Sequence, residues 1–145
     1  MEVTVDDLIE TIDNVDVSFE AAEAIDQTKD AIKTLQKDQL LHGLRADGSL
    51  IGKYKNADYA RMKNSLNPVP GLGNMDWKLS GDLYKEIFVE VRDDELIIDS
   101  ADPKAAGLEE RLGDPFGLNQ KNQEAYVDSS LEEAFLERIR EATGL

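Results

Sequence analysis

The sequence predicts an α+β fold, in which N-terminal and C-terminal helices pack on a small antiparallel sheet built around a hairpin near residues 87–99. Helix-start signals at both ends of the chain precede apolar residues that recur three and four positions apart. Between them, two short aliphatic runs flank a charged turn, which is typical of a hairpin. With 145 residues and 41% hydrophobic content, the chain suits a single domain over residues 1–145.

The first expected element is a short helix near residues 5–14. Thr4 and Asp7 have the spacing of a capping box, and Leu8 and Ile12 follow at helical spacing. We expect this segment to form an extended helical arm over residues 1–16.

A second, longer helix of about 20 residues is expected from Ser18, because apolar residues from Phe19 to Leu35 keep the helical period. Only Asn14 to Val17 separates it from the first helix, so the two either stay apart or fuse into one.

The middle of the chain favours irregular structure. Asp47-Gly48 is the strongest turn signal in residues 46–58, and a brief helix is expected around Tyr59 to Lys63. Residues 64–76 then form a long loop rich in proline, glycine and asparagine, which excludes regular structure there. A loop of this length is either functional or ordered only on binding.

The C-terminal half is divided by helix caps. The hairpin comprises Ile87–Val91, a turn at Arg92–Glu95, and Leu96–Asp99. Helix starts are expected at Ser80, Asp102, Asn119 and Ser130, where Asp102 precedes a proline at the first helical position and Ser130 begins a capping box with Glu133.

Charge is the most distinctive property of the composition. The net charge is −15, but residues 41–78 carry 6 bases against 3 acids and lie between two acidic segments. Such a field repels DNA and anionic membranes and favours basic partners. The same net charge is equally consistent with a role in solubility alone. The basic centre could instead contact an acidic end of a neighbouring copy, an arrangement suited to rings.

The residue types argue against catalysis. The chain has no cysteine and a single histidine, His42, which excludes thiolate zinc sites and serine triads. The acids of residues 93–102 could hold a hard cation, but they lack a calcium-loop spacing, and hairpin turns attract acids anyway. Gly71-Leu72-Gly73 lacks the lysine of a phosphate loop. We therefore expect no catalytic residues, no cofactor and no metal site, and a small hydrolase with paired carboxylates is the least favoured alternative.

Candidate interface residues come from the loop, the basic centre and a later turn with two large apolar side chains. Trp77, beside the loop, suits either the core or an interface hot spot. The full set is Asn67, Pro68, Pro70, Leu72, Trp77, Arg45, Lys53, Lys55, Arg61, Lys63, Phe116 and Leu118.

Several segments occur in an order that resembles a known group. Residues 36–58, QKDQLLHGLRADGSLIGKYKNAD, the segment from Trp77 to Tyr84, the hairpin, and the stretch from Leu108 to Asn119 are similar to small structural or assembly proteins of tailed phages and prophages of Bacteroidetes-type hosts. The similarity covers roughly residues 30–145. The order of the S/T-G-x-L motif and the hairpin also resembles, more weakly, head–tail joining and tail-completion proteins of phages.

The resemblance implies a virion protein of the neck or tail. We expect a head–tail connector, ring or tail-completion component that assembles as a homo-oligomeric ring with portal, neck or tail proteins. It would be made in the host cytoplasm and carried in the virion, without sequence-specific nucleic-acid binding. The N-terminus lacks signal-peptide features and no apolar run approaches the roughly 20 residues that span a bilayer, so no membrane contact is expected. The alternative is an acidic regulatory or DNA-mimic protein that binds a basic partner.

Overall fold

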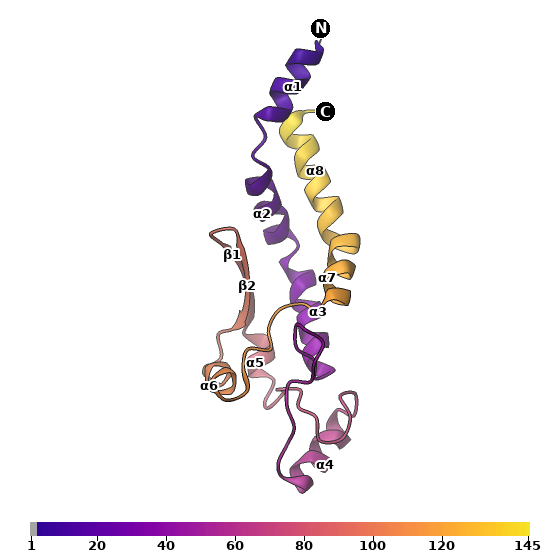
Figure 1. Ribbon diagram of the computed structural model, residues 1–145, viewed down its shortest axis with the longest axis vertical. Coiled ribbons are helices and arrows are strands. Elements are labelled where there is room, and N and C mark those ends of the chain that lie inside the picture. The colour runs from indigo at the N-terminus through magenta and orange to yellow at the C-terminus, as the bar shows by residue number, and fades with distance from the viewer. Residues whose placement is uncertain (1–2) are drawn as a thin grey trace.

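The computed structural model describes residues 3–145 and has the α+β fold that the sequence predicts (Figure 1). The molecule is elongated. Helix α1 (Val5–Asp13) lies at one end of the long axis beside the C-terminal end of α8 (Glu132–Thr143), and α4 (Ala57–Leu66) lies at the other end. Helices α2 (Val17–Gln27) and α3 (Lys29–Leu41) connect the two ends along the axis.

The hairpin is a two-stranded antiparallel sheet of β1 (Ile87–Arg92) and β2 (Glu95–Ser100), as the sequence predicts. Asp93 and Asp94 form its turn with φ values of 51° and 63°. Positive φ at both central residues is the geometry that matches the right-handed twist of the strands. Both α2 and α3 pack against β1.

The C-terminal half continues from this sheet through further helices, and its last helix packs against α2. Helix α5 (Asp82–Lys85) precedes the hairpin, and α6 (Pro103–Leu112) follows it. Helix α7 (Gln120–Tyr126), the π-helical turn η1 (Val127–Leu131) and α8 then form one uninterrupted helical run, and α8 packs against α2.

Two apolar clusters fill the interior. The larger one joins the end of α3 to the hairpin and α6, and it contains Trp77, whose ring meets that of Phe116 edge-on at a centroid distance of 6.1 Å. The smaller one joins α3 to β1 and α7 around Ile32, Val89, Leu118 and Tyr126.

The predicted helix of about 20 residues from Ser18 is wrong, because the chain breaks at Thr28 into α2 and α3. The Thr28 hydroxyl bonds the carbonyl oxygen of Ala24 at 2.7 Å and the hydroxyl of Tyr126 at 2.6 Å. This side chain therefore serves a tertiary contact at the break. The first helix remains separate from α2, and the predicted arm of residues 1–16 is described from residue 3 onward.

Three predicted boundaries are also corrected. Ser130 caps no helix; it lies inside η1, in a segment that is already helical. Residues 64–66 belong to α4 and not to the loop. Gly81, with a φ of 91°, is the N-cap of α5 instead of Ser80. The caps predicted at Thr4, Asp102 and Asn119 are confirmed.

Within residues 3–145, no helix combines the length and apolar character needed to cross a bilayer.

Candidate interaction surfaces

The N-terminal arm, defined here as residues 3–16, carries an apolar stripe that contacts little of its own chain. Helix α1 has no buried residue, and Val5, Ile9 and Ile12 are 71%, 51% and 55% exposed. A capping box between Thr4 and Asp7 holds its start: the amide of Asp7 donates to the Thr4 hydroxyl at 3.1 Å, and the amide of Thr4 donates to the Asp7 carboxylate at 3.0 Å. The helix is thus locally stabilised while its apolar side faces solvent.

The residues after α4 are ordered by a buried ion pair. The Lys63 ammonium lies 3.0 Å from the Asp76 carboxylate, and both side chains are less than one-tenth exposed. The same ammonium donates to the carbonyl oxygen of Lys78. A buried charge of either sign is costly without its partner, so this pair fixes where the loop begins and ends.

Asn67 and Tyr84 complete the network around Asp76. The Asn67 amide donates to the other Asp76 carboxylate oxygen at 3.0 Å and to the carbonyl oxygen of Leu41 at 2.9 Å. The Tyr84 hydroxyl donates to the backbone carbonyl of Asp76, and burial, followed by the Asp76 charge, raises the pKa of this phenol. The proline-rich loop is therefore held within its own chain, and Leu72 near its tip is 63% exposed.

A groove of about 420 Å³, called here the basic groove, lies between α6 and the segment 53–59. Its apolar wall comes from Tyr54, Tyr59, Met75, Leu108 and Leu112. The two tyrosine rings meet edge-on at 5.0 Å.

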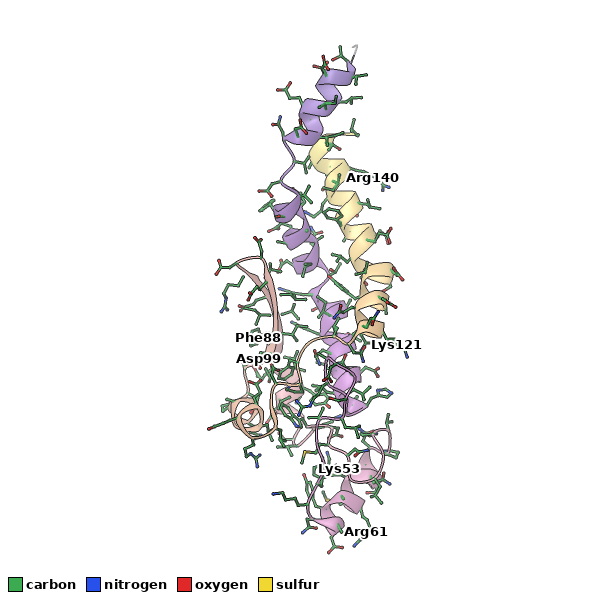
Figure 2. All side chains as sticks on the ribbon, in the orientation of Figure 1. Lys53, Arg61, Phe88, Asp99, Lys121 and Arg140 are labelled. Atoms are coloured by element: carbon green, nitrogen blue, oxygen red, sulfur yellow. The ribbon has the colours of Figure 1, made fainter. Side chains whose placement is uncertain are left out.

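Three cations line the same groove: Lys53, Lys55 and Arg111. All three are exposed, and none of them forms an ion pair with any part of residues 3–145. Figure 2 shows Lys53 toward the α4 end of the molecule, opposite the arm. In a chain of net charge −15, three unpaired cations around one apolar wall make a local surface suited to an anionic, partly apolar ligand.

A second groove, of about 660 Å³, lies between β2 and the α7–η1 region and is called here the apolar groove. Leu96, Phe116 and Tyr126 contribute to its wall. Its charged lining residues are Asp99 and Asp114, so its local charge is negative where that of the basic groove is positive.

Four of the candidate interface residues lie in the interior. Trp77, Phe116 and Leu118 belong to the apolar clusters, and Lys63 is paired with Asp76. Little of these four side chains is exposed, and Phe116 and Leu118 reach the surface only as part of the wall of the apolar groove. Trp77 therefore lies in the core and is not an exposed interface residue.

Seven further candidates lie in three places. Lys53 and Lys55 line the basic groove, whereas Arg61 lies on α4 in an exposed ion pair with Asp58. Asn67, Pro68, Pro70 and Leu72 lie in the loop.

Arg45 binds backbone carbonyls and not a partner's carboxylate. Its guanidinium donates to the carbonyl oxygens of Ile51 at 2.8 Å, Leu50 at 3.3 Å, Asp114 at 3.5 Å and Leu112. These carbonyls come from segments more than 60 positions apart in sequence, so the side chain fastens the chain after α3 to the chain after α6.

A second polar cluster fastens α3 to the same C-terminal segment. The buried Gln39 amide donates to the carbonyl oxygen of Gly117 at 2.8 Å, and its oxygen accepts from the amide of Asn119 at 2.8 Å and from the Asn122 side chain at 3.0 Å. The amide of Gly117 donates to the Gln36 side chain at 2.9 Å.

The acidic residues near the hairpin have structural partners. Asp102 caps α6 by accepting from the amide of Lys104 at 2.8 Å, and Asp99 accepts from the amide of Ser100 at 2.7 Å. In the described part of the chain, no group of three or more His, Cys, Asp or Glu residues is placed to hold a metal ion. His42 is exposed at the end of α3, where its ring lies 2.8 Å from the carbonyl oxygen of Asp38.

The surroundings of Glu109 raise the pKa of its carboxyl group. Burial, then a hydrogen bond and charge from Asp99, and finally the charge of Asp114 raise its pKa to about 7. Its oxygen Oε1 is buried and finds no donor among the described residues. Burial disfavours the charged carboxylate, and a proton shared with Asp99 would also satisfy that oxygen, so both effects raise the pKa.

Comparisons of this chain with protein-family models, curated proteins and solved structures find no match.

Sequence reasoning missed part of the basic groove. Lys53 and Lys55 were identified from the basic centre, but Arg111 and Leu108 come from α6, more than 50 positions later. No local pattern links the two segments. The alternation of acids and aliphatic residues in residues 5–13 was, by contrast, a readable signal for the arm.

Proposed function

We propose that this protein is a structural assembly component of the neck or tail of a tailed phage, and that it acts through contacts with copies of itself and with other virion proteins. The observation that carries the assembly role is the N-terminal arm. An amphipathic helix with exposed Val5, Ile9 and Ile12 exposes apolar area that water solvates poorly, and a partner surface would cover it.

The distribution of charge supports the same role. The arm carries five acids (Asp6, Asp7, Glu10, Asp13 and Asp16) and no base, while the unpaired cations of the basic groove lie toward the other end of the long axis. A molecule with opposite charges at its two ends favours head-to-tail contacts over random association. The phage setting comes from the resemblance of residues 30–145 to virion assembly proteins.

Three measurements test this function. Light scattering on the purified full chain should give a mass that is a multiple of 16.1 kDa, and electron microscopy should show closed or stacked particles. Mass spectrometry of purified phage particles from a strain that carries the gene should detect the protein. A strictly monomeric chain that is absent from particles would contradict the proposal.

The net charge of −15 supports a second function, an acidic regulatory protein that occupies the nucleic-acid site of a basic partner. Such binding would weaken steeply with salt, because it depends on charge. Pull-down with a panel of DNA-binding proteins at low and high salt tests it. The exposed apolar stripe of the arm favours assembly over this alternative, since a phosphate mimic needs charge and not aliphatic side chains.

A further inference from the structure

We propose that the N-terminal arm of one copy docks in the basic groove of a second copy, so that neighbouring molecules join head to tail. This inference rests on the assembly role and names the two surfaces that carry it. Each of the two surfaces presents apolar side chains bordered by charge, and the charges have opposite signs.

The geometry of α1 gives the arm a single apolar side. At 3.6 residues per turn, Val5, Leu8, Ile9 and Ile12 fall within an arc of about 100°. Asp6 and Asp13 lie next to one border of that arc by the same rotation. The other two acids of the helix, Asp7 and Glu10, lie farther around the helix axis from the apolar arc. The arm thus offers aliphatic side chains with carboxylates along one edge.

The basic groove provides the matching features. Met75, Leu108 and Leu112 supply aliphatic and thioether groups, and Tyr54 and Tyr59 add ring faces. A volume of about 420 Å³ is within the range of sites that enclose small apolar groups. Lys53, Lys55 and Arg111 would meet the carboxylates of Asp6 and Asp13.

The donor of the arm must be a second copy. Helices α2 and α3 separate the arm from α4 along the long axis (Figure 1), and at 1.5 Å per residue they span roughly 35 Å. The arm therefore cannot fold back into the groove of its own chain without unfolding this connection.

The charges of the two grooves indicate that the basic groove, and not the apolar groove, receives the arm. Asp99 and Asp114 line the larger apolar groove, and they would repel the carboxylates of the arm. The three cations of the basic groove attract the same carboxylates. Docking of unlike surfaces leaves a further arm and a further groove on each pair, so the contact closes into a ring or extends as a filament.

Cysteine cross-linking tests the contact directly, because the chain has no cysteine of its own. One variant carries Ile9→Cys and a second carries Tyr59→Cys; both positions are exposed, and circular dichroism confirms that each variant folds. Mixed under mild oxidation, the two should form a disulfide-linked heterodimer. The matched control replaces the second variant with Leu96→Cys, in the apolar groove, and should give only background cross-linking. Stronger cross-linking to Leu96→Cys, or none to either, would overturn the inference.

A charge-swap experiment tests the electrostatic attraction between the arm and the basic groove. The variant Asp6→Lys/Asp13→Lys and the variant Lys55→Glu/Arg111→Glu should each lose the wild-type mass in light scattering, and their equimolar mixture should regain at least a dimer. Ile9→Asp should also lose that mass while keeping the helical spectrum.

The outcomes separate this inference from the assembly role. If oligomers persist in Ile9→Asp and no cross-link forms, assembly uses another surface and the arm-to-groove contact is wrong. If the wild-type chain is monomeric at about 1 mM, where even weak contacts populate, the contact between copies is wrong. If the chain is also absent from particles, the assembly role falls with it.

Discussion

The carboxylate of Asp76 lies 3.0 Å from the ammonium of Lys63, and this buried pair joins the end of α4 to the residue that precedes Trp77. The two side chains enclose the proline-rich loop between them. Asn67 attaches to the same carboxylate at 3.0 Å, so the loop has a fixed base even though its tip is exposed.

Removal of one partner of this pair should be strongly destabilising. Asp76→Ala leaves the buried Lys63 ammonium without its counter-charge, with only the carbonyl oxygen of Lys78 as a partner, and we expect a loss of about 3–5 kcal/mol in the free energy of unfolding. Urea denaturation measures this loss. Arg61→Ala is the matched control, because it removes an exposed pair with Asp58 and should cost less than about 1 kcal/mol. Equal effects of the two variants would show that the buried pair does not anchor the loop.

Arg45 should not be replaceable by lysine. A single ammonium cannot reach the carbonyl oxygens of Ile51 and Leu112 in the geometry of a guanidinium, so Arg45→Lys should destabilise the fold by about 2 kcal/mol. Thermal denaturation followed by circular dichroism checks this. Arg61→Lys, on the exposed face of α4, should change stability by less than about 0.5 kcal/mol.

Gln39 should be essential for packing of the segment 117–122 on α3. Gln39→Leu keeps the volume but leaves the amide of Asn119 and the carbonyl of Gly117 without a partner, and we expect a cost of about 2–3 kcal/mol. Hydrogen exchange should show faster exchange at the amide of Asn119. The control Gln120→Leu changes an exposed side chain; protection of Asn119 that is the same in both variants would contradict the role of Gln39.

The raised pKa of Glu109 predicts that stability depends on pH. The folded state binds this proton up to a pKa of about 7, whereas the unfolded chain releases it near the ordinary value of 4.5. The stabilising contribution of the protonated group is therefore complete below pH 4.5 and is lost as the pH rises through 7.

Glu109→Gln isolates this effect. The amide stays neutral, so the variant should exceed the wild type by about 1 kcal/mol at pH 8 and should lose that advantage near pH 4.5. Denaturant titrations across this pH range measure it. Glu110→Gln, on an exposed neighbour, serves as the control, and an identical pH dependence in the two variants would remove Glu109 as the cause.

Local signals predicted the elements whose chemistry is local. The capping box of Thr4 with Asp7, the proline after Asp102 and the hairpin depend on residues within a few positions of one another, and each is confirmed. The break at Thr28 was missed, because the contact of its hydroxyl with Tyr126 joins residues 98 positions apart.

The candidate surfaces show the same difference between local signals and long-range contacts. The amphipathic pattern of α1 was visible in sequence, whereas burial of Lys63 and of Leu118 depends on tertiary packing that a count of charges or apolar residues does not contain. From the sequence alone, a lysine in a basic segment such as Lys63 is expected to be exposed. Its burial becomes apparent only when the fold places Asp76, 13 positions later, beside it.

The π-helical turn between α7 and α8 determines the rotational phase of the last helix. A π turn holds one residue more than an α turn, so Val127–Leu131 takes up an extra residue within a single turn. If the same residues kept the regular α period instead, everything after them would be rotated by about 100° around the helix axis. Phe135 and Ile139 would turn away from α2, and Arg138 would leave Glu20, which it now meets at 2.7 Å. One extra residue therefore sets which side of α8 the N-terminal half of the protein meets.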